Sequence, residues 1–168
     1  WAAAGALIPI PGLLVGAVGL SVPLIFGALG GVISERVGVV NVAIEGQLLA
    51  GAFVSAVVAS VIKDSFFGPL LGLLAAVVAG VLVAFVLAAF SIKYFVDQVI
   101  VGVVLNVLVV GLTSFLFSKV LAPNAALLNS PPRFPRLPIP LLSEIPILGP
   151  VLFRQTIIVY IMYVAVAV

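Results

Sequence analysis

Long uncharged runs dominate this sequence and limit what it can fold into. Residues 12–33, 66–92 and 99–118 contain no Asp, Glu, Lys or Arg. An α-helix rises about 1.5 Å per residue, so a run of about 20 residues can cross the roughly 30 Å hydrocarbon core of a bilayer. Only 7% of the residues are charged and 65% are apolar, whereas soluble domains have about 25% charged residues. The sequence therefore predicts an all-α fold, a polytopic transmembrane helical bundle.

The segment between the first two runs predicts a broken or re-entrant second membrane segment. Residues 47–62 would give only about 24 Å of helix, which is too short to span a bilayer. Residues 34–46 are therefore expected to enter the membrane too, although they carry Asn41, Glu45 and two glycines. Polar groups beside glycines are typical of broken helices in transporters. We predict that Asn41 and Glu45 mark the break and lie at a translocation path or its gate. The alternative is that Glu45 pairs with Arg36 at the membrane surface and caps a helix.

Small and polar residues form stripes on the last two runs. Small residues recur at every fourth position of the 66–92 run and predict a face for close helix packing: Gly68, Gly72, Ala76, Gly80, Ala84 and Ala88. In the 99–118 run, Gly102, Asn106 and Thr113 fall on one helical face. An amide in the middle of a membrane needs partners. Asn106 and Thr113 are therefore candidate residues of a translocation path or gate, and the alternative is an interhelical hydrogen bond that holds the bundle together.

A proline-rich region follows the last run. Residues 122–155 contain 8 of the 12 prolines, in stretches such as PPRFPRLPIP that cannot form regular helix. We interpret them as an extramembranous loop that packs over helix ends. The apolar residues 156–168 are too few to cross a bilayer, because they give only roughly 20 Å of helix. The first residue is Trp1 and not Met, so we expect both ends to be truncated.

The composition argues against enzyme chemistry and against nucleic acid. There is no Cys and no His, so the chain offers no thiol nucleophile, no histidine base and no soft metal site. The sequence also lacks the phosphate-binding motif G-x-x-x-x-G-K-[ST]. The net charge is only +2 and the basic residues are scattered, which gives no footprint for nucleic acid. We therefore expect no enzyme activity, no metal and no cofactor in this chain.

Three blocks of the sequence together resemble a known transporter family. They are GGVISERVGVVNVAIEGQLLAGAF at residues 30–53, DQVIVGVVLNVLVVGLTSFL at 97–116 and LPIPLLSEIPILGPVLF at 137–153. In this order they are similar to the permease subunits of bacterial ABC importers, in the nucleoside branch of the family that also serves simple sugars and branched-chain amino acids. The resemblance extends over nearly the whole chain. It implies that residues 1–168 are the N-terminal part of one transmembrane permease domain.

The resemblance implies a function and a set of partners. Such a permease is a multi-pass protein of the bacterial inner (plasma) membrane, and it forms part of the path for nucleosides or a related small polar solute. It pairs with a second permease subunit, receives solute from an extracytoplasmic substrate-binding lipoprotein, and is driven by a cytoplasmic ATP-binding subunit that hydrolyses ATP.

Three alternatives stay open at this point. One is a simple-sugar or branched-chain amino-acid permease of the same family. Another is a secondary transporter, although such a protein would normally show more intramembrane acids. The third is a nontransporting scaffold, for which the packing face would be needed but a broken helix would not.

Orientation is a point on which charge and resemblance disagree. Lys and Arg are more numerous beside and within residues 122–155 than on the opposite side of the predicted spans, so the positive-inside rule would place this loop in the cytoplasm. The resemblance implies the opposite, because the next helix must descend to a cytoplasmic coupling segment. We follow the resemblance and expect the loop on the extracytoplasmic face.

Overall fold

The computed structural model describes residues 10–139, 143 and 148–168. The chain divides into two compact units. One combines Trp1–Phe26 with Phe134–Val168, and the other is Gly27–Arg133. Each unit has a hydrophobic cluster of its own, and the boundary between them falls inside the first helix, α1 (Ile10–Arg36).

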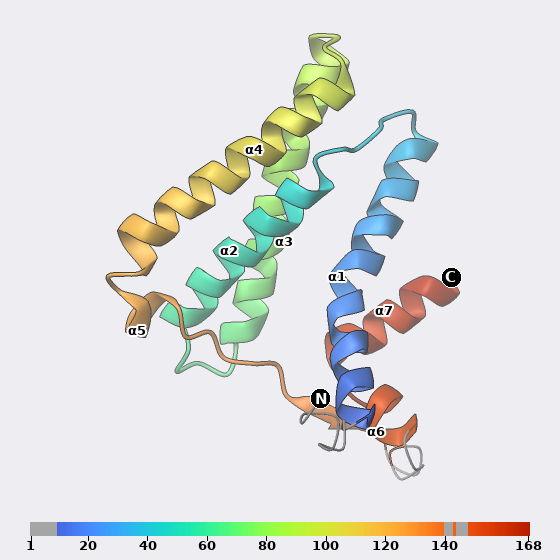
Figure 1. The fold of residues 1–168 in the computed structure, drawn as a ribbon, viewed down its shortest axis with the longest axis vertical. Helices are drawn as coiled ribbons and strands as arrows, with labels where there is room; N and C mark the ends of the chain where they lie inside the picture. Colours follow the sequence, from blue (N-terminus) through green and yellow to red (C-terminus); the bar gives the residue numbers. More distant parts are fainter. Residues whose placement is uncertain (1–9, 140–142, 144–147) are drawn as a thin grey trace, which may run out of the picture. The chain divides into compact units, whose positions relative to one another are not determined.

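Four of the described helices are long and apolar enough to cross a membrane (Figure 1). This confirms the predicted all-α polytopic bundle. The helices after α1 are α2 (Ile44–Val61), α3 (Gly68–Ala88), extended by the π-helical turn η2 (Ala89–Lys93), and α4 (Gln98–Leu116), extended by the π-helical turn η3 (Phe117–Leu121). The uncharged runs of the sequence correspond to α1, α3 and α4, and the last apolar stretch forms the shorter helix α7 (Ile157–Ala167).

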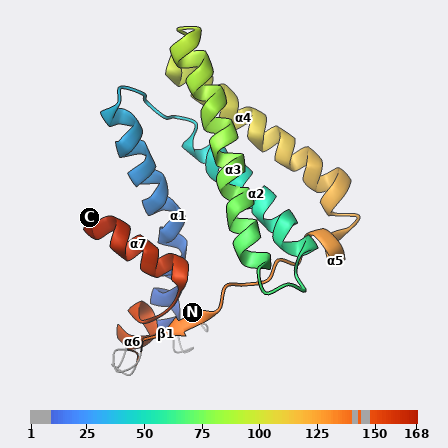
Figure 2. The same ribbon diagram turned by 180° about the vertical axis from the view of Figure 1, so that it is seen from behind.

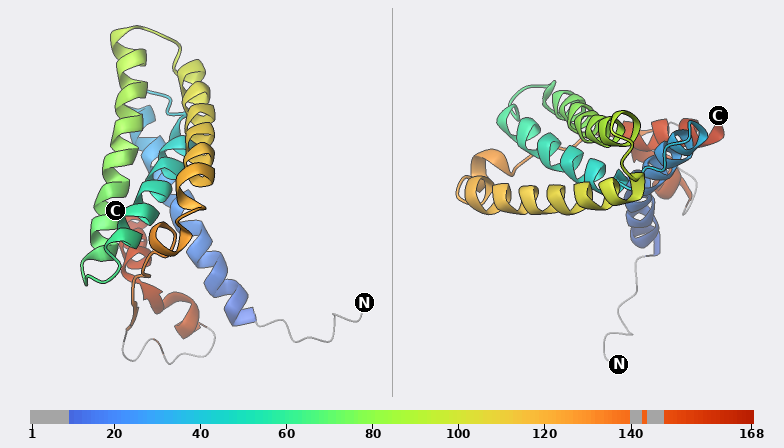
Figure 3. Two further views of the ribbon diagram at one scale, coloured as in Figure 1. Left: turned by 90° about the vertical axis from the view of Figure 1, so that its left-hand side faces the viewer. Right: turned by 90° about the horizontal axis from the view of Figure 1, so that it is seen from above.

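Within the second unit, α2 lies between α3 and α4 (Figure 3). Ala43 at the start of α2, Leu87 of α3 and two residues of α4, Val101 and Leu105, form the buried cluster of this unit. The lipid-length helices α3 and α4 keep most of their large apolar side chains exposed, as expected of a protein whose surroundings are hydrocarbon.

The small-residue face of α3 lies against α2. Gly68 and Gly72 are buried, and the four alanines and glycines that continue this face are partly buried. A Cβ atom added to Gly72 would stand 2.9 Å from the Cβ of Ala59 and 3.1 Å from the carbonyl oxygen of Ser55. On the α2 side, a Cβ on Gly51 would stand 3.2 Å from the carbonyl oxygen of Ala76. The two backbones therefore approach closely because side chains are missing on both helices.

The proline-rich region contains more regular structure than its sequence indicates. It includes the short helices α5 (Ala125–Leu128) and α6 (Leu148–Leu152) and the strands β1 (Arg136–Pro138) and β2 (Arg154–Thr156). The strands pair antiparallel, with Leu137 opposite Gln155 (Figure 2). Residues 140–142 and 144–147 of this region lie outside the described residues. The prolines do exclude long helix, but a two-stranded sheet was not predicted.

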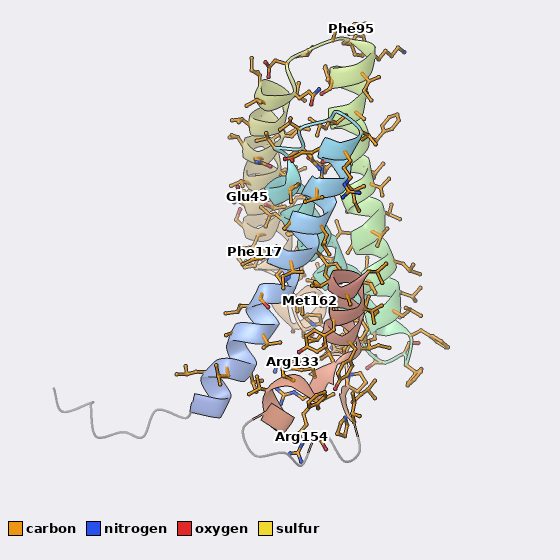
Figure 4. All side chains as sticks on the ribbon, turned by 90° about the vertical axis from the view of Figure 1, so that its right-hand side faces the viewer. Glu45, Phe95, Phe117, Arg133, Arg154 and Met162 are labelled. Atoms are coloured by element: carbon orange, nitrogen blue, oxygen red, sulfur yellow. The ribbon has the colours of Figure 1, made fainter. Side chains whose placement is uncertain are left out.

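The first unit is held together by α1, α7 and this small sheet. Val22 of α1 packs with Val159 and Met162 of α7 in a buried cluster, and Met162 is labelled in Figure 4. The hydroxyl of Tyr160 donates a hydrogen bond of 2.8 Å to the carbonyl oxygen of Leu137. The start of α7 is thereby attached to β1.

We predict different effects of one substitution at two glycines of α3. Gly72→Ala should destabilise the folded permease by about 1 to 3 kcal/mol, because its new methyl group overpacks the contact with α2. Gly80→Ala should be neutral or stabilising by up to about 1 kcal/mol, through helix propensity, since its Cβ would meet only the carbonyl oxygen of Gln47, at 3.9 Å. Thermal unfolding of both variants in detergent measures the difference. Equal unfolding temperatures would contradict a tight α2–α3 contact at Gly72.

Candidate functional site

Residues 37–43 are not helical, and α2 is one continuous helix from Ile44 to Val61. We call residues 37–43 the break, and their entry into the membrane stays a prediction. The end of α1 explains why the chain leaves the helix here. The N–H of Gly38 donates to the carbonyl of Glu35, at 3.0 Å, and the N–H of Val39 donates to that of Ser34, also at 3.0 Å. This is the pattern of a Schellman motif, which needs a left-handed residue. Gly38 supplies it with φ of 83°.

Asn106 of α4 holds the start of α2. Its Oδ1 accepts a hydrogen bond of 2.7 Å from the N–H of Gly46, and its Nδ2 donates one of 2.9 Å to the carbonyl oxygen of Val42. Helix α2 has no side-chain cap from its own N-cap residue, Ala43. The first N–H groups of a helix have no partner within the helix. Asn106 therefore caps α2 from a neighbouring helix, 60 positions along the chain.

Gln98 holds the same segment nearer the end of α1. Its Oε1 accepts from the N–H of Val40, and its Nε2 donates to the carbonyl oxygen of Gly38 at 3.4 Å. Like Asn106, this amide satisfies one backbone donor and one backbone acceptor of the non-helical segment. We did not select Gln98 from the sequence, although its spacing of four residues from Gly102, and eight from Asn106, was a signal that could have revealed it.

Between the two amides the backbones come close together. A Cβ atom on Gly102 would stand 2.7 Å from the Cβ of Val42 and 3.1 Å from the backbone nitrogen of Ala43. A Cβ on Gly46 would stand 2.8 Å from Oδ1 of Asn106. Both glycines are therefore required by the approach of α4 to the break. We call Gln98 and Asn106, with Gly102 between them, the amide clamp.

Asn41 and Glu45 take different positions at the break. Asn41 lies in the non-helical segment, partly buried, and its amide pairs with that of Gln47 through two hydrogen bonds of 3.1 Å. Glu45 lies in the first turn of α2 and is exposed (Figure 4). An acid in the first turn is favoured by the helix dipole. The two residues do not share a helical face, because only Glu45 is in a helix.

Thr113 lies farther along α4 and is not brought to the break. Its hydroxyl donates to the carbonyl oxygen of Val109 at 2.7 Å, within its own helix. The site therefore joins Asn41, Glu45 and Asn106 at the start of α2, with Gln98 added by the structure. Within the described part of the chain there is no group of three or more His, Cys, Asp or Glu side chains that could hold a metal ion.

The fold and the site define a class: a multi-pass helical membrane protein whose second span starts at a break held by polar side chains, as in transport proteins. More specifically, the chain belongs to the family of permease components of the branched-chain amino acid transport system, whose model matches residues 13–167. It is thus a permease component, a noncatalytic type of subunit, and a multi-pass protein of the inner membrane.

Individual relatives are named for nucleosides and for a sugar. The chain is 40% identical to the guanosine ABC transporter permease protein NupQ of Bacillus subtilis, over 86% of this chain and 46% of the relative. It is 36% identical to the nucleoside ABC transporter permease protein NupC of Lactococcus lactis, over 81% of this chain and 43% of the relative. A putative glucose ABC transporter permease protein of Haloferax volcanii is 34% identical, over 94% of this chain and 46% of the relative. The chain thus spans less than half the length of these relatives, and no solved structure matches it.

We predict that Asn106→Ala destabilises the folded permease by about 1 to 3 kcal/mol for each backbone group left without a partner. The groups at risk are the N–H of Gly46 and the carbonyl of Val42. Thr113→Val, in the same helix, is the matched control and should change stability much less, because its hydroxyl bonds only within α4. Denaturant titration or thermal unfolding measures both. A loss of stability in Thr113→Val as large as that in Asn106→Ala would show that the hydrogen bonds of Asn106 to α2 contribute no more to stability than a bond within α4.

Proposed function

We propose that this chain is part of the permease subunit of an ABC importer for nucleosides. The observation that carries the proposal is the similarity to two permeases named for guanosine and nucleosides, at 40% and 36% identity. The site agrees with a polar, uncharged solute, since it offers amides and one carboxylate beside the non-helical segment that connects α1 and α2. Among the described residues it has no set of metal ligands. Transport of a small sugar is the second candidate, and the similarity to a putative glucose permease favours it.

The break at the start of α2 is the place where we propose that solute passes. Glu45 is exposed on α2, a helix that packs against both α3 and α4. A carboxylate is costly in lipid, so it belongs beside protein or water. Asn41 lies four positions before it and has an amide partner that solute could replace. In this proposal Asn41 and Glu45 face the path or its gate. Asn106 fixes the backbone of their neighbours Val42 and Gly46, and Thr113 adds a hydroxyl farther along the same face of α4.

The proposed assembly follows from the family. ATP would be hydrolysed by a cytoplasmic ATP-binding subunit, solute would arrive on an extracytoplasmic substrate-binding lipoprotein, and a second permease subunit would complete the path. The chain would be the N-terminal part of one permease domain. Residues 122–155 would lie on the extracytoplasmic face, which puts the α3–α4 turn and the end of α1 at the cytoplasmic face.

Transport by the complete importer tests the function. We expect uptake of radiolabelled guanosine that depends on ATP and not on an ion gradient. Asn41→Ala and Glu45→Gln should each reduce uptake about tenfold or more while the subunits still assemble, because a removed hydrogen-bonding group is worth about one factor of ten in rate or affinity. Leu48→Ala, on the exposed side of α2 next to Glu45, serves as the control. Full uptake by both polar variants would remove Asn41 and Glu45 from the path.

Labelling at Asn129 tests the orientation. This residue is exposed and follows α5. Residues 1–168 contain no Cys, so Asn129→Cys would introduce the sole thiol among them. An impermeant thiol reagent added outside intact cells should modify it. Modification only after the cytoplasmic side is opened to the reagent would invert the topology and support the positive-inside count.

A further inference from the structure

A second polar site lies at the α3–α4 turn. It shares Gln98, Gly38 and Val40 with the break but does not include Asn41 or Glu45. An open cavity of about 360 Å³ is bordered by the end of α3, the start of α4 and the segment after α1. This volume is at the lower end of the range for pockets that hold small molecules, which is about 300 to 1,000 Å³. Its lining residues are Gly38, Val40, Ser91, Phe95, Val96, Asp97, Gln98 and Val99.

Ser91 is a polar group that the fold leaves unused. It lies in the π-helical turn η2 and is only 9% exposed. Its buried hydroxyl has no hydrogen-bond partner among the described residues. Buried hydroxyls are almost always bonded, so an exception calls for a partner that is absent from the isolated chain. π-Helical turns are also common where a helix contributes to a functional site.

Asp97 and Phe95 complement this hydroxyl. The Oδ1 atom of Asp97 caps α4 by accepting from the N–H groups of Val99, at 2.8 Å, and Ile100, at 3.2 Å. Since both bonds use Oδ1, the second carboxylate oxygen is left for another donor. Phe95 is 89% exposed at the turn (Figure 4). Its φ of 55° is unfavourable for a residue with a side chain.

We propose that this cavity is a second nucleoside subsite, in which the base stacks on Phe95 and the ribose hydroxyls bond to Asp97 and Ser91. The proposal rests on the proposed function and names the solute's next contact after the break. In the orientation given above, it lies at the cytoplasmic end of the spans, where solute leaves. Gln98 is a positioning residue here, because both ends of its amide are already bonded to the cavity wall, at Val40 and Gly38.

The chemistry of the lining favours a nucleoside over the other solutes of the family. The free carboxylate oxygen of Asp97 accepts hydrogen bonds and repels anions, which disfavours the carboxylate of an amino acid. A sugar could use Asp97 and Ser91 but has no aromatic ring to stack on the ring of Phe95. Stacking on an aromatic side chain is available to every base and does not depend on its identity. The subsite should therefore accept purine and pyrimidine nucleosides alike.

The test uses the permease assembled with its partner permease and ATP-binding subunit in detergent, without the substrate-binding lipoprotein. Guanosine, uridine and glucose are each titrated while thermal unfolding is followed, since a ligand that binds only the folded state stabilises it by RT ln(1 + [L]/Kd) and raises the unfolding temperature. The variants are Ser91→Ala, Asp97→Asn and Phe95→Leu. Asparagine is as good an N-cap as aspartate, so the second variant keeps α4 capped and removes the charge.

Three substitutions outside the cavity are the matched controls: Ser118→Ala, Asp64→Asn and Phe117→Leu. We expect guanosine and uridine to stabilise the wild type and the controls. Each cavity variant should bind nucleoside about fivefold to tenfold more weakly, the effect of losing one hydrogen bond or one stacking contact. Ser91→Ala carries a further signature: without ligand it should be as stable as the wild type or more stable, because it removes an unbonded buried hydroxyl.

The outcomes separate this proposal from the proposed function. If the wild-type importer takes up guanosine but the three cavity variants bind nucleosides as the wild type does, the subsite is wrong and the function stands. If glucose stabilises the wild type through these residues and nucleosides do not, the assigned solute is wrong. If the wild-type importer transports no nucleoside at all, the proposed function fails, and with it this inference.

Discussion

The contact between Asn106 and the start of α2 is the interaction on which the rest of the second unit depends. The first N–H groups of a helix have no partner within the helix, so they need a partner from elsewhere. Asn106 supplies such a partner to the first turn of α2, because its amide oxygen accepts from the N–H of Gly46. Its amide nitrogen also donates to the carbonyl oxygen of Val42, just before the helix. Without a partner at this place, the chain could not leave α1, turn and start α2 so close to α4.

The small residues around the break follow from the same contact. Gly46 and Gly102 have no room for a side chain, because α4 must come near enough for a short asparagine side chain to reach the backbone. Once α2 is fixed against α4, its opposite side is available to α3, where Gly72 and Gly51 again allow close approach. The absence of side chains on three neighbouring helices therefore serves one purpose. It lets the backbone of α2 approach those of α3 and α4 closely.

The sequence predicted the parts of this structure that depend on local composition. Uncharged length predicted α1, α3 and α4, and the polar residues and glycines within residues 34–46 predicted a departure from helix there. It could not identify which groups meet across the chain: Asn41 was placed at the break, but its pairing with Gln47 was not foreseen. Gln98 was overlooked because an amide beside Asp97 at a helix start is typical of an ordinary surface, and its true partners lie 58 and 60 positions away. The small sheet was missed because prolines exclude helix without indicating which extended segments pair.

The division of work between amides and carboxylates at the break has a physical reason. An amide donates and accepts at once, so a single neutral side chain can satisfy an N–H and a C=O in a medium where a charge is costly. A carboxylate in the place of Asn106 could accept from Gly46 but could not donate to Val42, and it would bring a charge against buried backbone. Glu45 takes no part in the clamp and is exposed at the start of α2, where the helix dipole favours a negative charge. The amides therefore fix the backbone of the break, and in the proposed function the carboxylate of Glu45 stays available to the solute.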